Sequence, residues 1–166
     1  MFGDTPILRA SRAGNLRRVK VLLGNGVDPT VANIFGFTPL YFAASNGHTE
    51  VAELLLGKGV DIAARNHYGS TPLAAAASHG HNKIVKLLLS KGADINVANF
   101  DGITPISTAA SGGHLDVVQL LLDNGADITV ADNCGLRPFE VAKTGGHEQI
   151  YRLLLSHRVS TTVADK

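Results

Sequence analysis

The sequence predicts an all-α solenoid, in which short helix pairs stack on one another along the chain. Three observations predict it. A Thr-Pro step recurs every 33 residues, a run of three aliphatic residues recurs with the same period, and aromatic residues make up only 5% of the 166 residues while small residues are abundant. A fixed period of this length is the mark of a repeat array. The Thr-Pro steps begin at Thr5, Thr38, Thr71 and Thr104, and Arg137-Pro138 continues the interval.

Each Thr-Pro step predicts the start of a helix. A threonine hydroxyl can accept a hydrogen bond from a backbone N–H of the first turn, and proline suits the first helical position because its missing N–H would have had no partner there. A glycine stands two residues before every step, as Gly36 does before Thr38. Glycine permits a turn with positive φ, so each unit is predicted to begin with a tight turn followed by a helix.

The unit that begins at Thr38 illustrates the rest of the pattern. Leu40 and the Ala43-Ala44 pair form a short apolar stripe, which Gly47 ends, and a second helix follows with apolar residues at helical spacing over 51–55. Residues 60–66 are extended in character. The remaining units keep this register, with aliphatic runs at 21–23, 54–56, 87–89, 120–122 and 153–155. Because one such helix pair cannot bury its apolar surface alone, the units must stack, and the small residues allow close approach.

The pattern Gly-x-Thr-Pro-Leu-x-x-Ala-Ala-x-x-Gly-His followed by Leu-Leu-Leu-x-x-Gly-Ala-Asp resembles the ankyrin repeat. It covers nearly the whole chain as one domain of five repeats, at about 1–36, 37–69, 70–102, 103–135 and 136–166. The resemblance implies stacked antiparallel helix pairs with short projecting β-hairpin loops. One departure is the histidine that usually follows Thr-Pro-Leu, which is replaced by Leu8, Tyr41, Ala74, Ser107 and Glu140.

The first and last repeats are predicted to cap the array, because Arg9, Arg18, Lys143 and Arg158 stand where other repeats have apolar or small residues. Val163-Ala164-Asp165, however, repeats Val130-Ala131-Asp132 in register, as though another loop were starting. We expect the chain to be a segment of a larger protein; the alternative is a complete small protein whose end repeats have diverged.

Four histidines, at 48, 81, 114 and 147, recur with the same period. Equivalent positions in a helical stack lie about 10 Å apart, whereas zinc ligands lie at about 2 Å from one ion. We therefore expect turn residues that satisfy local backbone groups and no metal site. No phosphate-binding loop or nucleophile-elbow motif occurs, and Cys134 is expected to be an incidental exposed thiol. The sequence thus predicts neither an enzyme nor a cofactor nor a small-molecule substrate.

The charges are unevenly distributed. Residues 1–37 carry five basic and two acidic side chains, and residues 104–136 carry four acidic and no basic ones. The basic group does not continue along the array, so nucleic-acid binding by the first repeat is the less favoured alternative function. Four aspartates of the fourth repeat could select a basic partner. One cysteine, no apolar run long enough to span a membrane and no signal-peptide pattern favour a monomer in the cytoplasm or nucleus.

Aromatic residues give the sharpest functional indication. Five of the nine flank the turn glycines, at Phe2, Phe35, Phe37, Tyr68 and Phe100. Large apolar residues in loops contribute little to a core, and exposed ones mark interaction surfaces. The alternative is that some fold back onto the neighbouring loop.

The resemblance implies that a partner protein meets the loop tips and the concave face of the first helices. The chain is therefore expected to act as an interaction module or scaffold. The loop positions are Ile34, Phe35, Phe37, His67, Tyr68, Ser70, Phe100, Asp101, Ile103, Asn133, Cys134 and Leu136; the helix positions are Ser45, Asn46, Ser78, His79, Ser111 and Gly112.

Overall fold

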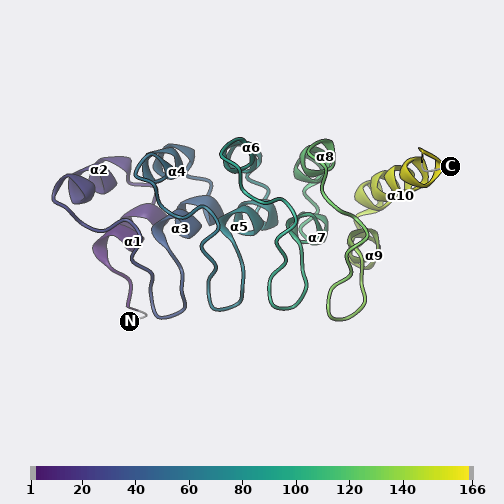
Figure 1. The fold of residues 1–166 in the computed structure, drawn as a ribbon, viewed down its shortest axis with the longest axis horizontal. Coiled ribbons are helices and arrows are strands. Elements are labelled where there is room, and N and C mark those ends of the chain that lie inside the picture. Colours follow the sequence, from purple (N-terminus) through teal and green to yellow (C-terminus); the bar gives the residue numbers. More distant parts are fainter. Residues whose placement is uncertain (1–2, 165–166) are drawn as a thin grey trace.

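The computed structural model describes residues 3–164 and forms a row of helix pairs with loops projecting from one edge (Figure 1). Five inner helices, α1, α3, α5, α7 and α9, lie beside the loops, and five outer helices, α2, α4, α6, α8 and α10, cover them. The bounds are α1 Pro6–Arg12, α2 Leu16–Gly24, α3 Pro39–Ser45, α4 Thr49–Leu56, α5 Pro72–Ser78, α6 Asn82–Ser90, α7 Pro105–Ser111, α8 Leu115–Asp123, α9 Pro138–Thr144 and α10 Glu148–Ala164.

Every inner helix begins at the proline of its Thr-Pro or Arg-Pro step, as predicted. The hydroxyls of Thr38, Thr71 and Thr104 accept hydrogen bonds from the backbone N–H three residues on, which confirms their capping role. Thr5 makes no such bond. Where Arg137 replaces threonine, the bond runs the other way: the Glu140 carboxylate accepts from the Arg137 backbone N–H at 2.8 Å.

The turn glycines are required by two constraints at once. Gly36 has φ +79°, and a Cβ placed on it would come within 3.0 Å of the Cα of Asn66 in the next repeat. Positive φ disfavours any residue with a Cβ, and the close neighbouring backbone leaves no room for one. The same glycine therefore shapes its own turn and allows the next repeat to approach.

The core lies between the two helix layers. Small residues of the inner helices, such as Ala43, Ala76 and Ala109, are completely buried, and the aliphatic runs of the outer helices cover them. The buried apolar residues fall into two clusters. One joins residues of the first two repeats, from Ala10 to Leu55, and the other continues from Ala44 to Leu154. The predicted stack of close-packed helices is confirmed.

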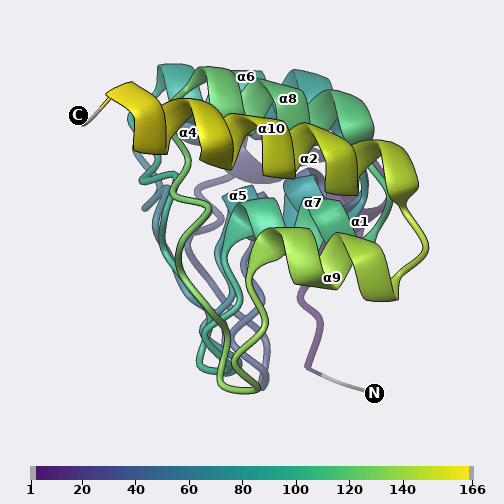
Figure 2. The same ribbon diagram turned by 90° about the vertical axis from the view of Figure 1, so that its right-hand side faces the viewer.

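Four finger loops, residues 25–38, 57–71, 91–104 and 124–137, connect each outer helix to the next inner helix and project away from the helices (Figures 1 and 2). Within residues 3–164 these loops contain no β-strand, so the β-hairpin character expected of them is not confirmed. Single backbone bonds join neighbouring loops, from His67 N–H to Phe35 O at 2.9 Å, from Phe100 N–H to Tyr68 O at 3.1 Å and from Asn133 N–H to Asp101 O at 2.9 Å.

The last helix differs from its equivalents. Helix α10 runs from Glu148 to Ala164, whereas α8 ends at Asp123, which corresponds to Ser156. Arg158 occupies the position of Gly125, whose φ is +82°. Without a glycine that readily adopts positive φ, the helix continues. The expectation that residues 163–165 begin another loop is therefore wrong for Val163 and Ala164, which are helical; Asp165 lies outside the described residues.

Candidate interaction surface

The finger loops and the inner helices meet at an angle (Figure 2), and we call the surface inside this angle the groove. The sequence-predicted helix positions lie at the ends of the inner helices. Ser45, Ser78 and Ser111 are the last residues of α3, α5 and α7, and Asn46, His79 and Gly112 are their C-caps. The predicted loop positions lie in the finger loops.

Each finger tip is closed by one polar side chain that the sequence analysis did not single out. The Oδ1 atoms of Asn33, Asn66, Asn99 and Asp132 each accept hydrogen bonds from the backbone N–H groups two and four residues on, at 2.9–3.1 Å. Asparagine and aspartate commonly stabilise turns in this way. Their 33-residue spacing was the signal in the sequence that could have identified them.

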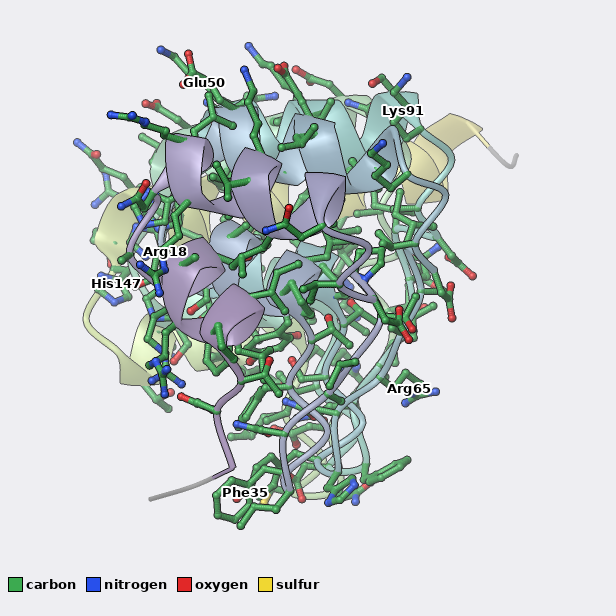
Figure 3. All side chains as sticks on the ribbon, turned by 90° about the vertical axis from the view of Figure 1, so that its left-hand side faces the viewer. Arg18, Phe35, Glu50, Arg65, Lys91 and His147 are labelled. Atoms are coloured by element: carbon green, nitrogen blue, oxygen red, sulfur yellow. The ribbon has the colours of Figure 1, made fainter. Side chains whose placement is uncertain are left out.

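The predicted loop aromatics divide into two groups. Tyr68 and Phe100 are 57% and 65% exposed, and Ile34 is 62% exposed. Phe35 and Phe37, by contrast, are half-buried. Figure 3 shows Phe35 at the outer end of the loops, far from the outer helices. Phe2 lies outside the described residues. The exposed apolar side chains therefore come from three consecutive fingers, one from each.

Phe37 is the centre of an aromatic cluster. Its ring centroid lies 4.8 Å from that of Tyr41, 5.5 Å from that of Phe42 and 6.3 Å from that of Tyr68. Phe42 is buried, and burial raises the pKa of Tyr41, an effect that hydrogen bonds with Ser70 and Asn66 oppose. Phe37 thus packs against Tyr68 and supports it, while Tyr68 itself stays mostly exposed. The loop aromatics therefore include both a packed and an exposed side chain.

Arg65 links the second finger to the third. Its Nε donates to the carbonyl of Gly69 at 2.9 Å, its Nη2 donates to the carbonyl of Ala98, and its guanidinium lies 5.2 Å from the ring centroid of Phe100. Arg65 itself is exposed (Figure 3). A cation held over an aromatic face attracts it, so Phe100 is held in place although it is mostly exposed.

The four periodic histidines bind the backbone, but not within their own repeat. Nε2 of His48, His81, His114 and His147 donates to the carbonyl oxygens of Arg12, Ser45, Ser78 and Ser111, respectively, at 2.9–3.0 Å. Each acceptor belongs to the preceding repeat. The expectation of a local partner is therefore corrected: these histidines join one repeat to the next, because each ring lies over the end of the neighbouring inner helix.

At the start of the array, the groove is occupied by the chain's own side chains. The Arg12 guanidinium lies 3.9 Å from the ring centroid of Phe42, and its Nη1 lies 2.8 Å from Oδ2 of Asp4. Asp4 also accepts from Nδ2 of Asn33 at 2.9 Å. Part of the basic group of the first repeat is therefore paired within the chain.

Further along, the groove opens into a pocket of about 360 Å³ between α7, α9 and the fourth finger. It contains five of the predicted positions, Ser78, Ile103, Ser111, Gly112 and Leu136, together with Asp132 from the finger tip. Its remaining lining residues are Ser107, Thr108, Val141 and Thr144.

Other features of the surface carry no chemistry of their own. Cys134 is an exposed free thiol at the tip of the fourth finger, as expected. Among residues 3–164, no three histidine, cysteine or acidic side chains come together as metal ligands would. The helices in this same part of the chain include none with the length and apolar character needed to cross a bilayer.

A family model described as ankyrin repeats (three copies) matches residues 7–99 and again residues 97–165. The chain belongs to the ankyrin-repeat family. No protein with a curated description matches it. Ankyrin repeats generally serve as protein–protein interaction modules and are generally not enzymes.

Proposed function

We propose that this ankyrin-repeat protein binds a partner protein through its finger tips and the adjoining groove. The observation that carries the proposal is the exposure of Ile34, Tyr68 and Phe100 on three consecutive fingers. Large apolar side chains exposed on neighbouring loops are characteristic of interaction sites, and tyrosine and phenylalanine are enriched in interface cores.

The loops that present these side chains are well ordered by hydrogen bonds. The Oδ1 atom of Asn66 holds the Tyr68 and Ser70 amides, and Phe100 N–H is bonded to Tyr68 O. Arg65 adds a contact with Phe100. A surface that is already ordered loses little conformational entropy on binding, which favours affinity. The single cysteine favours a reducing compartment, so we place the module inside the cell.

A peptide-display selection on the immobilised full chain tests this proposal. Random twelve-residue peptides are selected on the wild-type protein, and the binders are measured against the double variant Tyr68→Ala, Phe100→Ala. Loss of two interface anchors is expected to weaken binding by about 2 kcal/mol or more, roughly 30-fold. The thermal midpoint of the double variant should stay close to that of the wild type, because both side chains are mostly exposed.

Two control variants separate binding from folding. Val21→Ala removes another exposed aliphatic side chain, 55% exposed on the outer helix α2, and should leave binding unchanged. Phe37→Ala removes the centre of the aromatic cluster and should lower the thermal midpoint. If the double variant binds the selected peptides as tightly as the wild type, or if Val21→Ala weakens them equally, the proposed surface is wrong.

A further inference from the structure

The groove changes character along the array. Phe42 lies at a position that Ala75, Thr108 and Val141 occupy in the following repeats. The position of Tyr41 is taken by Ala74, Ser107 and Glu140, and that of Arg12 by Ser45, Ser78 and Ser111. Large side chains therefore occupy most of these positions in the first two repeats. Small side chains occupy them in the third and fourth, and in the fourth all three bear hydroxyl groups. The pocket of about 360 Å³ is the space that this change leaves.

The pocket offers hydrogen-bond acceptors beside an apolar wall. Hydroxyl groups come from Ser78, Ser107, Thr108, Ser111 and Thr144, and the apolar wall from Ile103, Leu136 and Val141. No lysine or arginine lines it. Lys143 of α9 is not among the lining residues; its ammonium lies 5.5 Å from the ring centroid of Tyr151 on the outer helix α10.

The charge in the pocket comes from Asp132. Its Oδ1 accepts the hydrogen bonds from the amides of Cys134 and Leu136 at 2.9 Å. No partner is assigned to its Oδ2 within residues 3–164. The three other finger tips have asparagine at this position, so the closing of the loop needs only an oxygen acceptor and not a charge. The carboxylate thus adds a negative charge that the loop does not require, at a finger tip that faces an open pocket.

The first repeat shows how this groove accommodates a guanidinium. The Arg12 guanidinium lies over an apolar ring, that of Phe42, at 3.9 Å, while the carboxylate of Asp4 pairs with it at 2.8 Å. In the pocket, Asp132 supplies a carboxylate and Ile103, Leu136 and Val141 supply apolar surface, but the positions equivalent to Arg12 are Ser78, Ser111 and Thr144. The chain therefore provides the surroundings of an arginine side chain without the arginine.

We propose that this pocket binds an arginine side chain presented by the partner protein. The inference rests on the proposed protein-binding function and adds the chemistry that the partner must present. Arginine is favoured over lysine because its planar guanidinium can lie on an apolar wall while its N–H groups reach a carboxylate and several hydroxyls at once. The excess of acidic residues in 104–136 attracts the same charge.

A direct titration tests the pocket without the partner. N-acetyl-arginine methylamide is added to the isotopically labelled full chain, and the amide signals of Cys134 and Leu136 are followed by NMR. We expect saturable shifts at these amides and around Thr108, weakened by added salt. N-acetyl-citrulline methylamide, which has the same shape without the charge, should bind at least about tenfold more weakly, since hydrogen bonds between charged groups are the stronger ones.

Asp132→Asn provides a nearly isosteric variant that should fold, because asparagine closes the other three fingers in the same way. It should reduce the affinity for the arginine derivative at least about tenfold. Asp116→Asn, on the exposed first turn of the outer helix α8, removes an equal charge away from the pocket and should leave that affinity unchanged. Thr108→Phe copies Phe42 and should abolish the shifts by filling the pocket.

Equal binding of the arginine and citrulline derivatives, or equal binding to wild type and Asp132→Asn, would overturn the inference, as would the absence of any saturable shift. These results are independent of the peptide selection described above. If selected peptides bind through Tyr68 and Phe100 but tolerate Asp132→Asn without loss, the proposed function stands and the arginine pocket does not. If the titration succeeds while no peptide depends on Tyr68 and Phe100, the reverse holds.

Discussion

At the scale of single residues, the finger loops depend on one buried or half-buried acceptor each. In the third finger, Oδ1 of Asn99 holds the amides of Asp101 and Ile103, both at 2.9 Å. A lost acceptor leaves both N–H groups without their partner, which is a larger penalty than the net value of the bonds made. The same geometry with aspartate at position 132 shows that the acceptor oxygen matters more than the amide group.

We therefore expect Asn99→Ala to lower the free energy of unfolding by about 1–3 kcal/mol, and Asn99→Asp to lower it much less. Urea unfolding at neutral pH, followed by circular dichroism, measures both. The two variants are matched, because only alanine removes the acceptor. Equal destabilisation by the two substitutions would show that the amide nitrogen, and not the oxygen, stabilises the loop.

His81 makes stability depend on pH. Burial lowers its pKa below the ordinary 6.5, its hydrogen bond to the Ser45 carbonyl opposes this shift, and the charges of His79, His114 and His48 lower the pKa further. The unfolded chain then takes up the proton first as the pH falls. The contribution of neutral His81 to the free energy of unfolding is complete above pH 6.5. It is lost as the pH decreases from there towards the lower pKa of His81 in the folded state.

Comparison of the wild type with His81→Gln from pH 7.5 to 5.0 checks that His81 lowers the free energy of unfolding as the pH falls. Glutamine keeps an N–H donor for the Ser45 carbonyl but does not titrate. The free energy of unfolding of the variant should decrease less steeply with falling pH than that of the wild type. Parallel curves, or a steeper decrease in the variant, would contradict the depressed pKa.

At the scale of elements, helix length is decided by the glycine that follows each outer helix. Gly59, Gly92 and Gly125 have φ between +74° and +86°, and the helices before them end within a few residues. Arg158 takes this position in the last repeat, and α10 continues to Ala164. A left-handed residue at this point stops a helix because it turns the backbone out of the helical path.

Arg158→Gly should therefore end α10 near Ser156, as α8 ends at the equivalent Asp123. NMR carbon chemical shifts of residues 157–164 should move from helical towards random-coil values, since glycine favours the helix terminus and costs about 1 kcal/mol in a helix interior. Arg158→Ala serves as the control and should keep the helix. Persistence of helical shifts after the glycine substitution would mean that packing, and not residue 158, sets the helix end.

At the scale of the whole molecule, stability is spread over a row of neighbouring contacts. The two buried clusters divide near the second repeat: Leu55 belongs to the first and Leu88 to the second, and both are completely buried. The histidine–carbonyl bonds run between successive repeats, and the bond from His81 to Ser45 crosses this division. In such arrays each repeat gains stability from its immediate neighbours.

Leu55→Ala and Leu88→Ala are each expected to lower the free energy of unfolding by about 2–5 kcal/mol, but to loosen different regions. Hydrogen exchange should accelerate most in α2 and α4 for Leu55→Ala, and most in α6 and α8 for Leu88→Ala. Uniform acceleration over all helices in both variants would instead indicate a single cooperative unit.

Much of the fold could be predicted because short local signals recur every 33 residues along the chain. Thr38-Pro39, Gly36 and the run at 54–56 each specify a short-range event, namely a cap, a turn or an apolar face, and repetition makes the stack the only way to bury those faces. The family and the helix starts could therefore be predicted. The division of the loop aromatics could not, because whether Phe37 packs on Tyr41 and Tyr68 stays exposed depends on how neighbouring fingers pack together.

The ankyrin-repeat architecture of this protein follows from its sequence, since the register depends on backbone preferences that act over a few residues. Which groups meet between repeats follows from the stacking: the histidines meet carbonyls of the preceding repeat, Arg12 meets Phe42 and Asp4, and Asp132 meets an open pocket. These contacts join residues about one repeat apart. Their energies depend on burial and distance, which appear only once the repeats are stacked.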